Sequence, residues 1–471
     1  MLRKSTTAHP AQRLLSTLNV RREETGRLLA AALLFFLVLT ALMLLRPVRD
    51  ALGMAGGIDG VRWLFAGTAA ATLAVNPVFG WLVSRLGRLQ IIGATYGFFV
   101  LSLVAFWALL TFAPGVVGER SGQAFFVWFS VFNLFATMLF WALMADRFSE
   151  EQSKRVFGAI AVGGTLGAIF GPWLASVLAR PLGTAALMLV AAGFQSLALA
   201  AAWALTRFGV DPDSGGIAAA RTGARGGATA GDRAGPAALR ARDGTRQRAG
   251  DALIGGSAWE GLSAILRSPF LLGICGYVLI LAVMVTFLYF TRLQMVAALG
   301  TDLDMRTATF ARIDMITQIA TLVLQAIVTG HLMKRLGTSL TLALLPATAL
   351  LGFVGLAIVG SLAALVAFEA TFRAVQRGIM RPARETLFTS VTRAERYKAK
   401  AFIDTFVYRA GDVVGAQTEG MLGRLGMGLA ALAAFAAPLA LVWMALGLWL
   451  GRAQRGQPGR VEAERGEGAR A

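Results

Sequence analysis

The sequence has little charge, little histidine and almost no cysteine. Only 15% of its 471 residues are charged, and it contains one cysteine and two histidines. A soluble domain usually carries about 25% charged residues, so the composition excludes an ordinary soluble fold. A single cysteine excludes an internal disulfide framework. Because Cys275, His9 and His331 cannot form a metal cluster, we expect no metal site.

Enzyme motifs are also missing. None of the five lysines follows a glycine, so the chain has no Gly-Lys phosphate-binding loop of the kind that drives ATP-dependent pumps. The patterns Gly-x-Ser-x-Gly, Cys-x-x-Cys and His-Glu-x-x-His are absent as well. The sequence therefore predicts neither an enzyme nor a bound cofactor.

Apolar residues dominate what is present. They make up 56% of the chain, and the mean hydropathy is +0.64. Uncharged runs of 18 or more apolar residues are typical of membrane-spanning helices. We predict an all-α polytopic membrane protein with twelve transmembrane helices, at residues 28–45, 63–83, 91–112, 124–145, 156–178, 182–205, 270–291, 311–333, 340–358, 362–382, 401–422 and 426–450.

The net charge of +19 follows from where the arginines lie. Most of them fall in the tails and in loops on one side of the predicted topology, which is the positive-inside bias of insertion. A nucleic-acid partner is therefore excluded. Arg21, Arg22 and Arg27 precede the first span and no small-residue cleavage site follows it, so we expect an uncleaved anchor. The expected location is a bacterial inner membrane, with both termini in the cytoplasm.

The predicted spans divide into two sets of six. Between them, Gly209–Gly256 is rich in Gly, Ala and Arg and has almost no large apolar residues, so we expect it to be disordered. The predicted organisation is a cytoplasmic tail, a six-helix half, a cytoplasmic central loop, a second six-helix half and a second tail, at residues 1–27, 28–207, 208–268, 269–450 and 451–471.

Two short segments repeat between the halves. Gly80–Gly87 follows the second predicted span, Gly330–Gly337 follows the eighth, and five of their eight positions agree. Two six-helix halves with a long central loop are the layout of the major facilitator superfamily. The first segment also resembles that superfamily's loop between helices two and three, although Ser84 stands where the family usually has Asp. The candidate gating residues are Gly80, Arg85, Gly87, Gly330, Arg335 and Gly337.

Charged residues recur inside the predicted spans, where burial is costly and such groups usually mark a functional site. Two guanidinium groups close to each other suit a phosphate or a carboxylate. The candidate binding residues for an anionic solute are Arg46, Arg49, Arg373, Arg377 and Lys400. The candidate coupling or charge-partner residues are Asp50, Asp314, Glu369, Asp404, Arg409 and Asp412.

Spacing along the helices predicts some of the partners. Glu369 and Arg373 are four residues apart and share a helix face, and Arg409 and Asp412 are placed to pair three residues apart. The alternative for each cluster is a structural ion pair or an interfacial patch with no solute. Glycines 163, 164, 167 and 171 of the fifth span are spaced for close packing against another helix.

Three segments resemble the ATP/ADP translocase (nucleotide transporter) family, a distant branch of the facilitator superfamily. They are Leu45–Leu52, then Phe140-Trp141 with Glu151–Phe157, and Lys398–Asp404 with Arg409 and Gly411. The resemblance implies that cationic residues meet nucleotide phosphates. By this resemblance, Arg49 matches the family's lysine in helix one, and Lys400 matches its lysine late in the sequence. The family's acidic residue in helix seven has no counterpart in this chain, whose nearest candidates are Thr286 and Arg292.

We therefore predict a secondary active transporter of a small anionic or phosphorylated solute, working as a monomer in the lipid bilayer. One alternative is a proton-coupled exporter of drugs or metabolites. Another, from a different class, is a transporter-like membrane protein that serves as an assembly or sensory partner.

Overall fold

The computed structural model describes residues 25–207, with gaps at 86–87 and 114, and residues 263–455, with gaps at 264, 392 and 427. Helices account for nearly all of these residues, and no strand occurs among them. The predicted all-helical fold is thus confirmed. Residues 1–24 and 456–471 of the two predicted tails and the segment Gly209–Gly256 lie outside the described residues.

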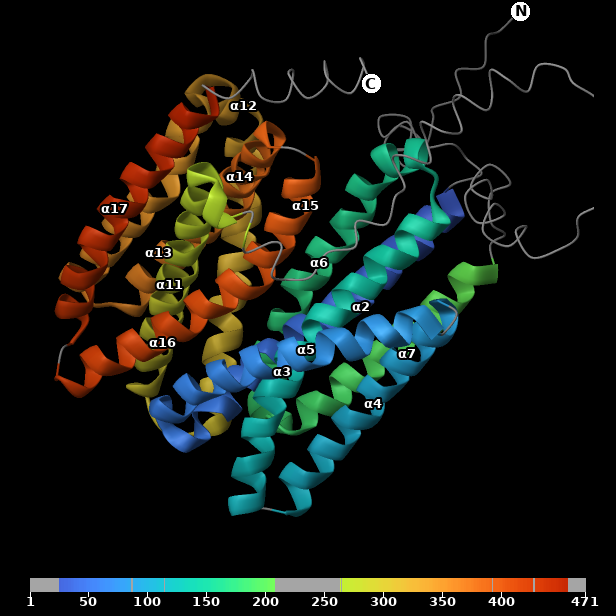
Figure 1. The fold of residues 1–471 in the computed structure, drawn as a ribbon. Helices are drawn as coiled ribbons and strands as arrows, with labels where there is room; N and C mark the ends of the chain where they lie inside the picture. Colours follow the sequence, from blue (N-terminus) through green and yellow to red (C-terminus); the bar gives the residue numbers. More distant parts are fainter. Residues whose placement is uncertain are drawn as a thin grey trace, which may run out of the picture.

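The N-terminal half consists of helices that cross the molecule in alternating directions (Figure 1). Its first helix contains Pro47 close to its end, and a single 3₁₀ turn, η2 (Met54–Gly56), joins it to the second. The helices of this half are α2 (Thr25–Gly53), α3 (Gly57–Arg85), α4 (Arg88–Phe112), α5 (Val116–Arg147), α6 (Glu150–Leu182) and α7 (Ala186–Arg207).

The C-terminal half has the same alternation with more interruptions. Its helices are α11 (Pro269–Ala297), α12 (Leu303–Val359), α13 (Leu362–Val375), α14 (Arg381–Leu387), α15 (Arg393–Phe402), α16 (Tyr408–Arg424) and α17 (Leu429–Arg455). The π-helical turns η5 (Gln376–Met380) and η7 (Ile403–Val407) join α13 to α14 and α15 to α16, and the 3₁₀ turn η6 (Phe388–Ser390) follows α14. Each of these two pairs therefore continues as one long element.

Gly337 and Gly360 mark the two ends of the second part of α12. Gly337 has φ +67° and ψ 169° inside α12, so α12 consists of two helices that meet at a sharp break. Gly360 ends α12 in the left-handed conformation, and the Ser361 side chain then caps α13 by accepting from the Ala364 N–H. The predicted boundary between the ninth and tenth spans, at Gly360-Ser361, is confirmed.

Not every helix is apolar enough to qualify as a span by itself. Eight candidate spans satisfy length and hydropathy in the described chain, and one of them runs through α2 and α3 together. The helices left out are the first part of α12, α13 with α14, and α15 with α16. These are the helices that carry most of the charged candidates, so they need neighbouring helices to shield them from lipid.

The glycines of α6 pack directly on α2, and their spacing predicts such close packing without naming the partner helix. A Cβ atom at Gly163 would overlap the carbonyl oxygen of Ala32, and one at Gly167 would overlap that of Phe36. Gly164 lies against the ring of Phe35 in the same way. Only glycine lets the two backbones approach this closely, and the contact fixes α2 within the N-terminal half.

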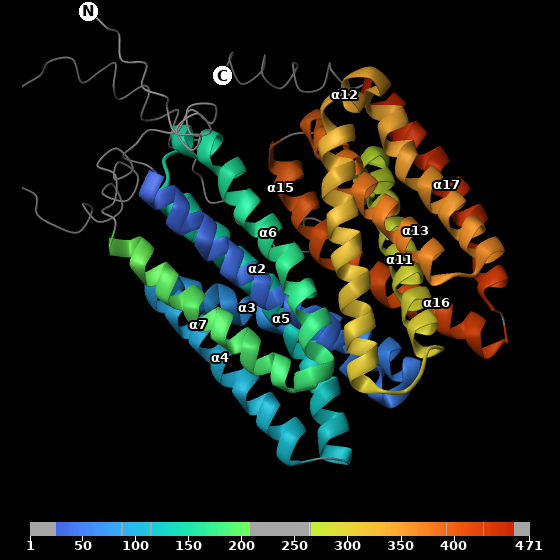
Figure 2. The ribbon, with the colours of Figure 1, turned by 180° about the vertical axis from the view of Figure 1, so that it is seen from behind.

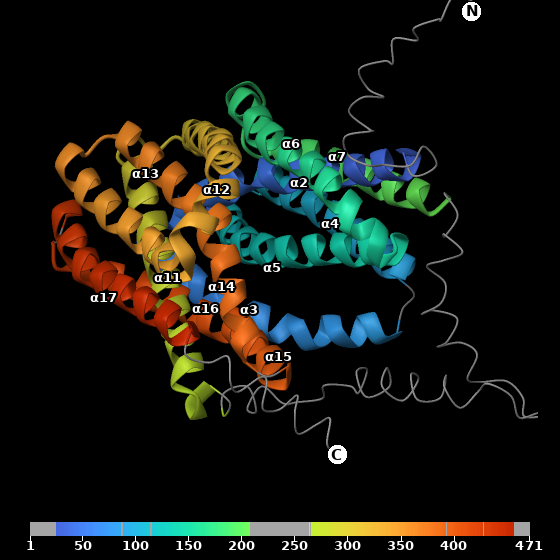
Figure 3. The same ribbon diagram turned by 90° about the horizontal axis from the view of Figure 1, so that it is seen from above.

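The halves meet near the end of the molecule where α2 ends and α3 begins (Figures 1 and 2). An apolar cluster containing Phe126 of α5 and Phe290 of α11 draws on both halves there. The view from above shows α12 beside α6 and α2 (Figure 3), and these helices are in contact. We call this region the closed end.

Candidate functional site

A buried ion-pair network joins four helices near the closed end. Arg292 of α11 is only 1% exposed, and its guanidinium donates to Asp50 Oδ2 at 2.8 Å and to Asp314 Oδ1 at 2.7 Å. A longer contact of 3.4 Å reaches Glu369 Oε1. Asp50 belongs to α2, whereas the other two acids belong to α12 and α13. The network therefore ties one half of the protein to the other.

Asp50 accepts hydrogen bonds from three side chains. Besides Arg292, the Nε atom of Arg49 donates to its Oδ1 atom at 2.9 Å, and the Tyr289 hydroxyl donates to the same oxygen at 2.9 Å. The Arg49 guanidinium also lies over the Phe126 ring, 4.8 Å from its centroid. A fully buried carboxylate is tolerated because donors surround it.

Two further arginines face the acids of the C-terminal half. Arg373 donates to Glu369 Oε1 from two nitrogen atoms, at 2.8 Å and 2.6 Å. The two residues are one turn apart on α13, so this is the pair that their four-residue spacing predicts. Arg46 of α2 lies 3.7 Å from Asp314 Oδ2, which is an ion pair without a hydrogen bond. Arg46 is therefore only loosely neutralised.

Arg377 has no carboxylate partner among the described residues. Its Nη1 atom donates to Gln318 Oε1 at 2.8 Å. Arg373 and Arg46 lie close enough to repel its charge, and Asp314 and Glu369 lie close enough to attract it. Five arginines thus surround three carboxylates, which leaves a formal net charge of +2. We call these side chains the central charge cluster: Arg46, Arg49, Asp50, Arg292, Asp314, Glu369, Arg373 and Arg377.

The cluster also has unused hydrogen-bonding capacity. Asp314 Oδ2, Glu369 Oε2 and Arg292 Nε are buried and have no hydrogen-bond partner in the described structure. Buried polar atoms are nearly always paired. The two carboxylate oxygens could therefore accept a proton, or a hydrogen bond from water or a solute, and the Arg292 Nε–H could donate a hydrogen bond.

Lys400 lies in a different place. It forms an ion pair with Glu385 of α14, beside a 3.2 Å pair between Arg384 and Asp404. In the described part of the chain, no hydrogen bond or ion pair joins Lys400 to the central charge cluster. The structure thus brings together four of the five predicted binding residues and leaves Lys400 apart. Lys400 is on α15, which pairs with α14, and the π-helical turns η5 and η7 separate these two helices from α13 and α16.

The remaining predicted charge partners form a local pair in α16. Arg409 contacts Asp412 at 3.1 Å, as the three-residue spacing predicts. The Thr286 hydroxyl of α11 approaches Asp412 Oδ1 at 3.5 Å. This pair belongs to the packing between α11 and α16, away from the five arginines.

The predicted gating residues are only partly described. Gly80 and Arg85 lie in α3, where the Arg85 guanidinium stacks on the Trp81 ring at 5.6 Å. Gly87 is outside the described residues, as are the side-chain surroundings of residues 330 and 335. Gly337 forms the break in α12.

A second buried connection between the halves is not among the predicted site residues. Arg62 of α3 contacts Glu419 of α16 at 2.9 Å, and Asp59 and Gln294 complete the group. The only signal in the sequence is an acid inside the eleventh predicted span. Arg292 is not among the predicted site residues either. In the sequence it is noted only because it lies near the position of the translocase family's acidic residue in helix seven, yet it is the centre of the network.

The fold and the site are those of a multi-pass helical membrane protein whose two halves are joined by buried ion pairs. The Major Facilitator Superfamily model matches residues 28–376, and the chain belongs to that superfamily. No curated protein sequence matches the chain significantly.

Several solved transporters share the fold. A point mutant of the nucleoside transporter NupG is similar with a TM-score of 0.64 and 11% identity over 92% of this chain and 100% of its own. The POT family transporter PepTSo gives 0.61 and 12%, over 92% and 99% of the two chains. A bacterial homologue of the iron transporter ferroportin, in an inward-facing state, gives 0.61 and 12%, over 91% and 98%. At 11–12% identity, these likenesses show that the chain shares the fold of these proteins.

Proposed function

We propose that the protein is a secondary active transporter of a small anionic, phosphorylated solute. The observation that carries this proposal is the net charge of +2 in the central charge cluster, where the amide of Gln318 is the only hydrogen-bond partner of Arg377 in the described structure. Uncompensated positive charge is expensive in a low-dielectric interior. An anion bound beside Arg46 and Arg377 would neutralise it.

Phosphate suits this group better than a monovalent organic anion. A phosphate carries up to two charges and several acceptor oxygens, and guanidinium groups bind it with paired, charge-assisted hydrogen bonds. Nucleotides are the first phosphorylated solutes to test, because the segments around Arg46 and Lys400 resemble the ATP/ADP translocases. One structural neighbour is a nucleoside transporter, which accords with that choice.

The closed end supports alternating access. In Figure 1 the two halves are joined where α2 meets α3, and the described hydrogen bonds and ion pairs between halves lie toward that end. With cytoplasmic termini in a bacterial inner membrane, this end faces the periplasm. Opening it requires the Arg292–Asp50 and Arg62–Glu419 pairs to separate. A solute bound beside Arg46 would compete with Asp314, which also binds Arg292, and would so link solute binding to the network that holds this end closed.

A proton-coupled exporter is the second candidate. It is favoured by the unpaired oxygens of Asp314 and Glu369, which are buried among arginines and could exchange protons as the cluster opens. In that case a gradient of protons, and not solute exchange, would drive transport.

Transport by purified protein in liposomes tests the proposal. Liposomes loaded with ATP, ADP or glucose 6-phosphate should take up the same labelled compound by counterflow, and Arg377→Ala should lose this uptake. Arg424→Gln is a matched control, since Arg424 is exposed at the end of α16 and has no described partner. Uptake of hydrophobic cations that follows an imposed pH gradient, with no phosphate counterflow, would instead identify the exporter.

A further inference from the structure

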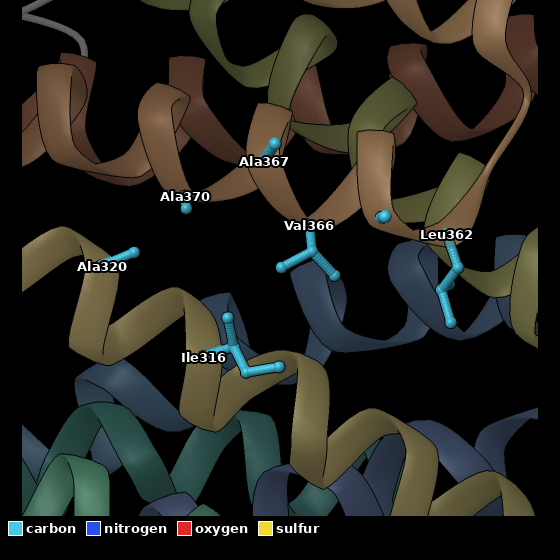
Figure 4. A pocket seen from close by; sticks show the side chains of 7 residues that line it. Ile316, Ala320, Leu362, Val366, Ala367 and Ala370 are labelled. Carbon is cyan, nitrogen blue, oxygen red and sulfur yellow. The ribbon is translucent and has the colours of Figure 1, made fainter.

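An apolar groove lies between α12 and α13, on the surface of the C-terminal half. Ile316 and Ala320 form its wall on α12, and residues of α13 including Leu362 and Val366 form the other wall, around a volume of about 500 Å³. Figure 4 shows these side chains facing one another across the groove, with Ala367 and Ala370 further along α13. The volume is that of a small-ligand site.

The groove faces lipid. On the same side of α12, Ile316, Ile319 and Val323 are 46%, 42% and 51% exposed. Two neighbouring polar residues of this helix lie elsewhere, since Asp314 is buried in the central charge cluster and Gln318 contacts Arg377. Exposed apolar side chains at helical spacing on a membrane protein are covered by acyl chains.

One charged residue interrupts this apolar face. Arg312 is exposed and lies four residues before Ile316, which places it one turn away on the same stripe of α12, about 6 Å along the axis. It has no hydrogen bond, ion pair or ring contact with any described residue. A charged side chain exposed to lipid is costly unless it reaches the interface or an ionic partner.

We propose that Arg312 and this groove form a binding site for one anionic phospholipid. The phosphate contacts the Arg312 guanidinium, and an acyl chain occupies the groove between α12 and α13. The polarity agrees with a bilayer, because Arg312 lies nearer to the start of α12 than the groove does. The head group thus lies on the side of the groove toward the start of α12, and the acyl chain runs away from it along the groove.

The location gives the lipid a role. The groove is formed by the two helices that supply Asp314, Glu369 and Arg373 to the central charge cluster, so a bound chain would steady their packing. Binding should therefore raise the thermal stability of the C-terminal half. The site itself does not depend on the identity of the transported solute.

Native mass spectrometry of the purified full chain, titrated with phosphatidylglycerol, tests the site. We expect one lipid to bind more tightly than the rest, and Arg312→Gln to weaken it about fivefold. Ala367→Phe should weaken it as well, because it fills the groove and keeps the charge. Arg424→Gln removes an exposed arginine outside the groove and should leave the affinity unchanged.

The remaining outcomes overturn the proposal. Unchanged phosphatidylglycerol affinity in both Arg312→Gln and Ala367→Phe would show that the groove is not the site. An equal loss in Arg424→Gln would show that any surface arginine serves. Glycerol phosphate, which lacks acyl chains, should not displace the lipid at equal concentration, and displacement would identify a site for free phosphate.

Discussion

Arg292 of α11 and Asp50 of α2 form a 2.8 Å ion pair between side chains that are 1% and 0% exposed. The pair is the shortest described charged link between the two halves within the central charge cluster. Breaking a buried pair by removing one partner leaves an uncompensated charge, at a cost of roughly 3–5 kcal/mol. We therefore expect the pair to stabilise the closed end.

Asp50→Asn should open the closed end. The substitution removes one of three negative charges from a cluster with five arginines, so repulsion between the halves rises. Spin labels at Trp63 and Leu425, which are 70% and 64% exposed near that end, should report longer distances in the variant. Cys275, the only native cysteine, is first replaced by Ser.

Asp404→Asn is the control for that measurement. It breaks the ion pair with Arg384 inside the C-terminal half and leaves the contacts between halves intact. Distances in this variant should match those of the native protein. A native-like distribution in Asp50→Asn would show that the Arg292 pair does not hold the closed end.

The Arg62 and Glu419 side chains should be energetically coupled across the halves. Both are buried, and they contact each other at 2.9 Å. A double-mutant cycle of Arg62→Ala and Glu419→Ala, read by thermal unfolding in detergent, should give a coupling free energy of roughly 0.5–3 kcal/mol. Additive effects of the two substitutions would mean that the pair contributes nothing to closure.

Glycine substitutions should separate packing positions from free ones on α6. Gly167→Ala places a Cβ against the Phe36 carbonyl oxygen and should destabilise the fold by about 1–3 kcal/mol. Gly158→Ala, on the same helix, meets nothing within 4 Å and should be neutral or stabilising. Equal melting temperatures for the two variants would contradict the close packing of α6 on α2.

The topology has a direct test outside the described residues. Reporter fusions at residue 230 and at the C-terminus should both be active in the cytoplasm, because arginine-rich segments are retained there. Periplasmic activity at either position would reverse the assignment of the closed end to the periplasm.

Much of the fold could be predicted from composition and periodicity. Uncharged runs locate the apolar helices, and glycine spacing predicts that α6 packs closely against another helix, which the structure shows to be α2. Pairs that lie within one helix, such as Glu369–Arg373 and Arg409–Asp412, follow from their three- and four-residue spacing. All of these depend on neighbours in sequence.

The partners of Arg292 could not be predicted in the same way. They lie on three other helices, up to 242 residues away, and only the fold brings them together. Lys400, in contrast, is predicted to belong to a site that it does not join. Charge and resemblance group it with the arginines, whereas the turn between α14 and α15 pairs it with Glu385. Charge type alone does not predict which helix end a side chain reaches.

Titration calorimetry on the purified protein tests the central claim most directly. Anion binding by the central charge cluster requires that ATP, ADP or glucose 6-phosphate bind the native protein, and that Arg377→Ala weaken binding by about 2–5 kcal/mol, roughly 30-fold or more. Arg377→Lys should retain part of the affinity, because it keeps the charge and loses the planar fork. Unchanged affinity in Arg377→Ala, or a preference for cationic solutes, would contradict the account.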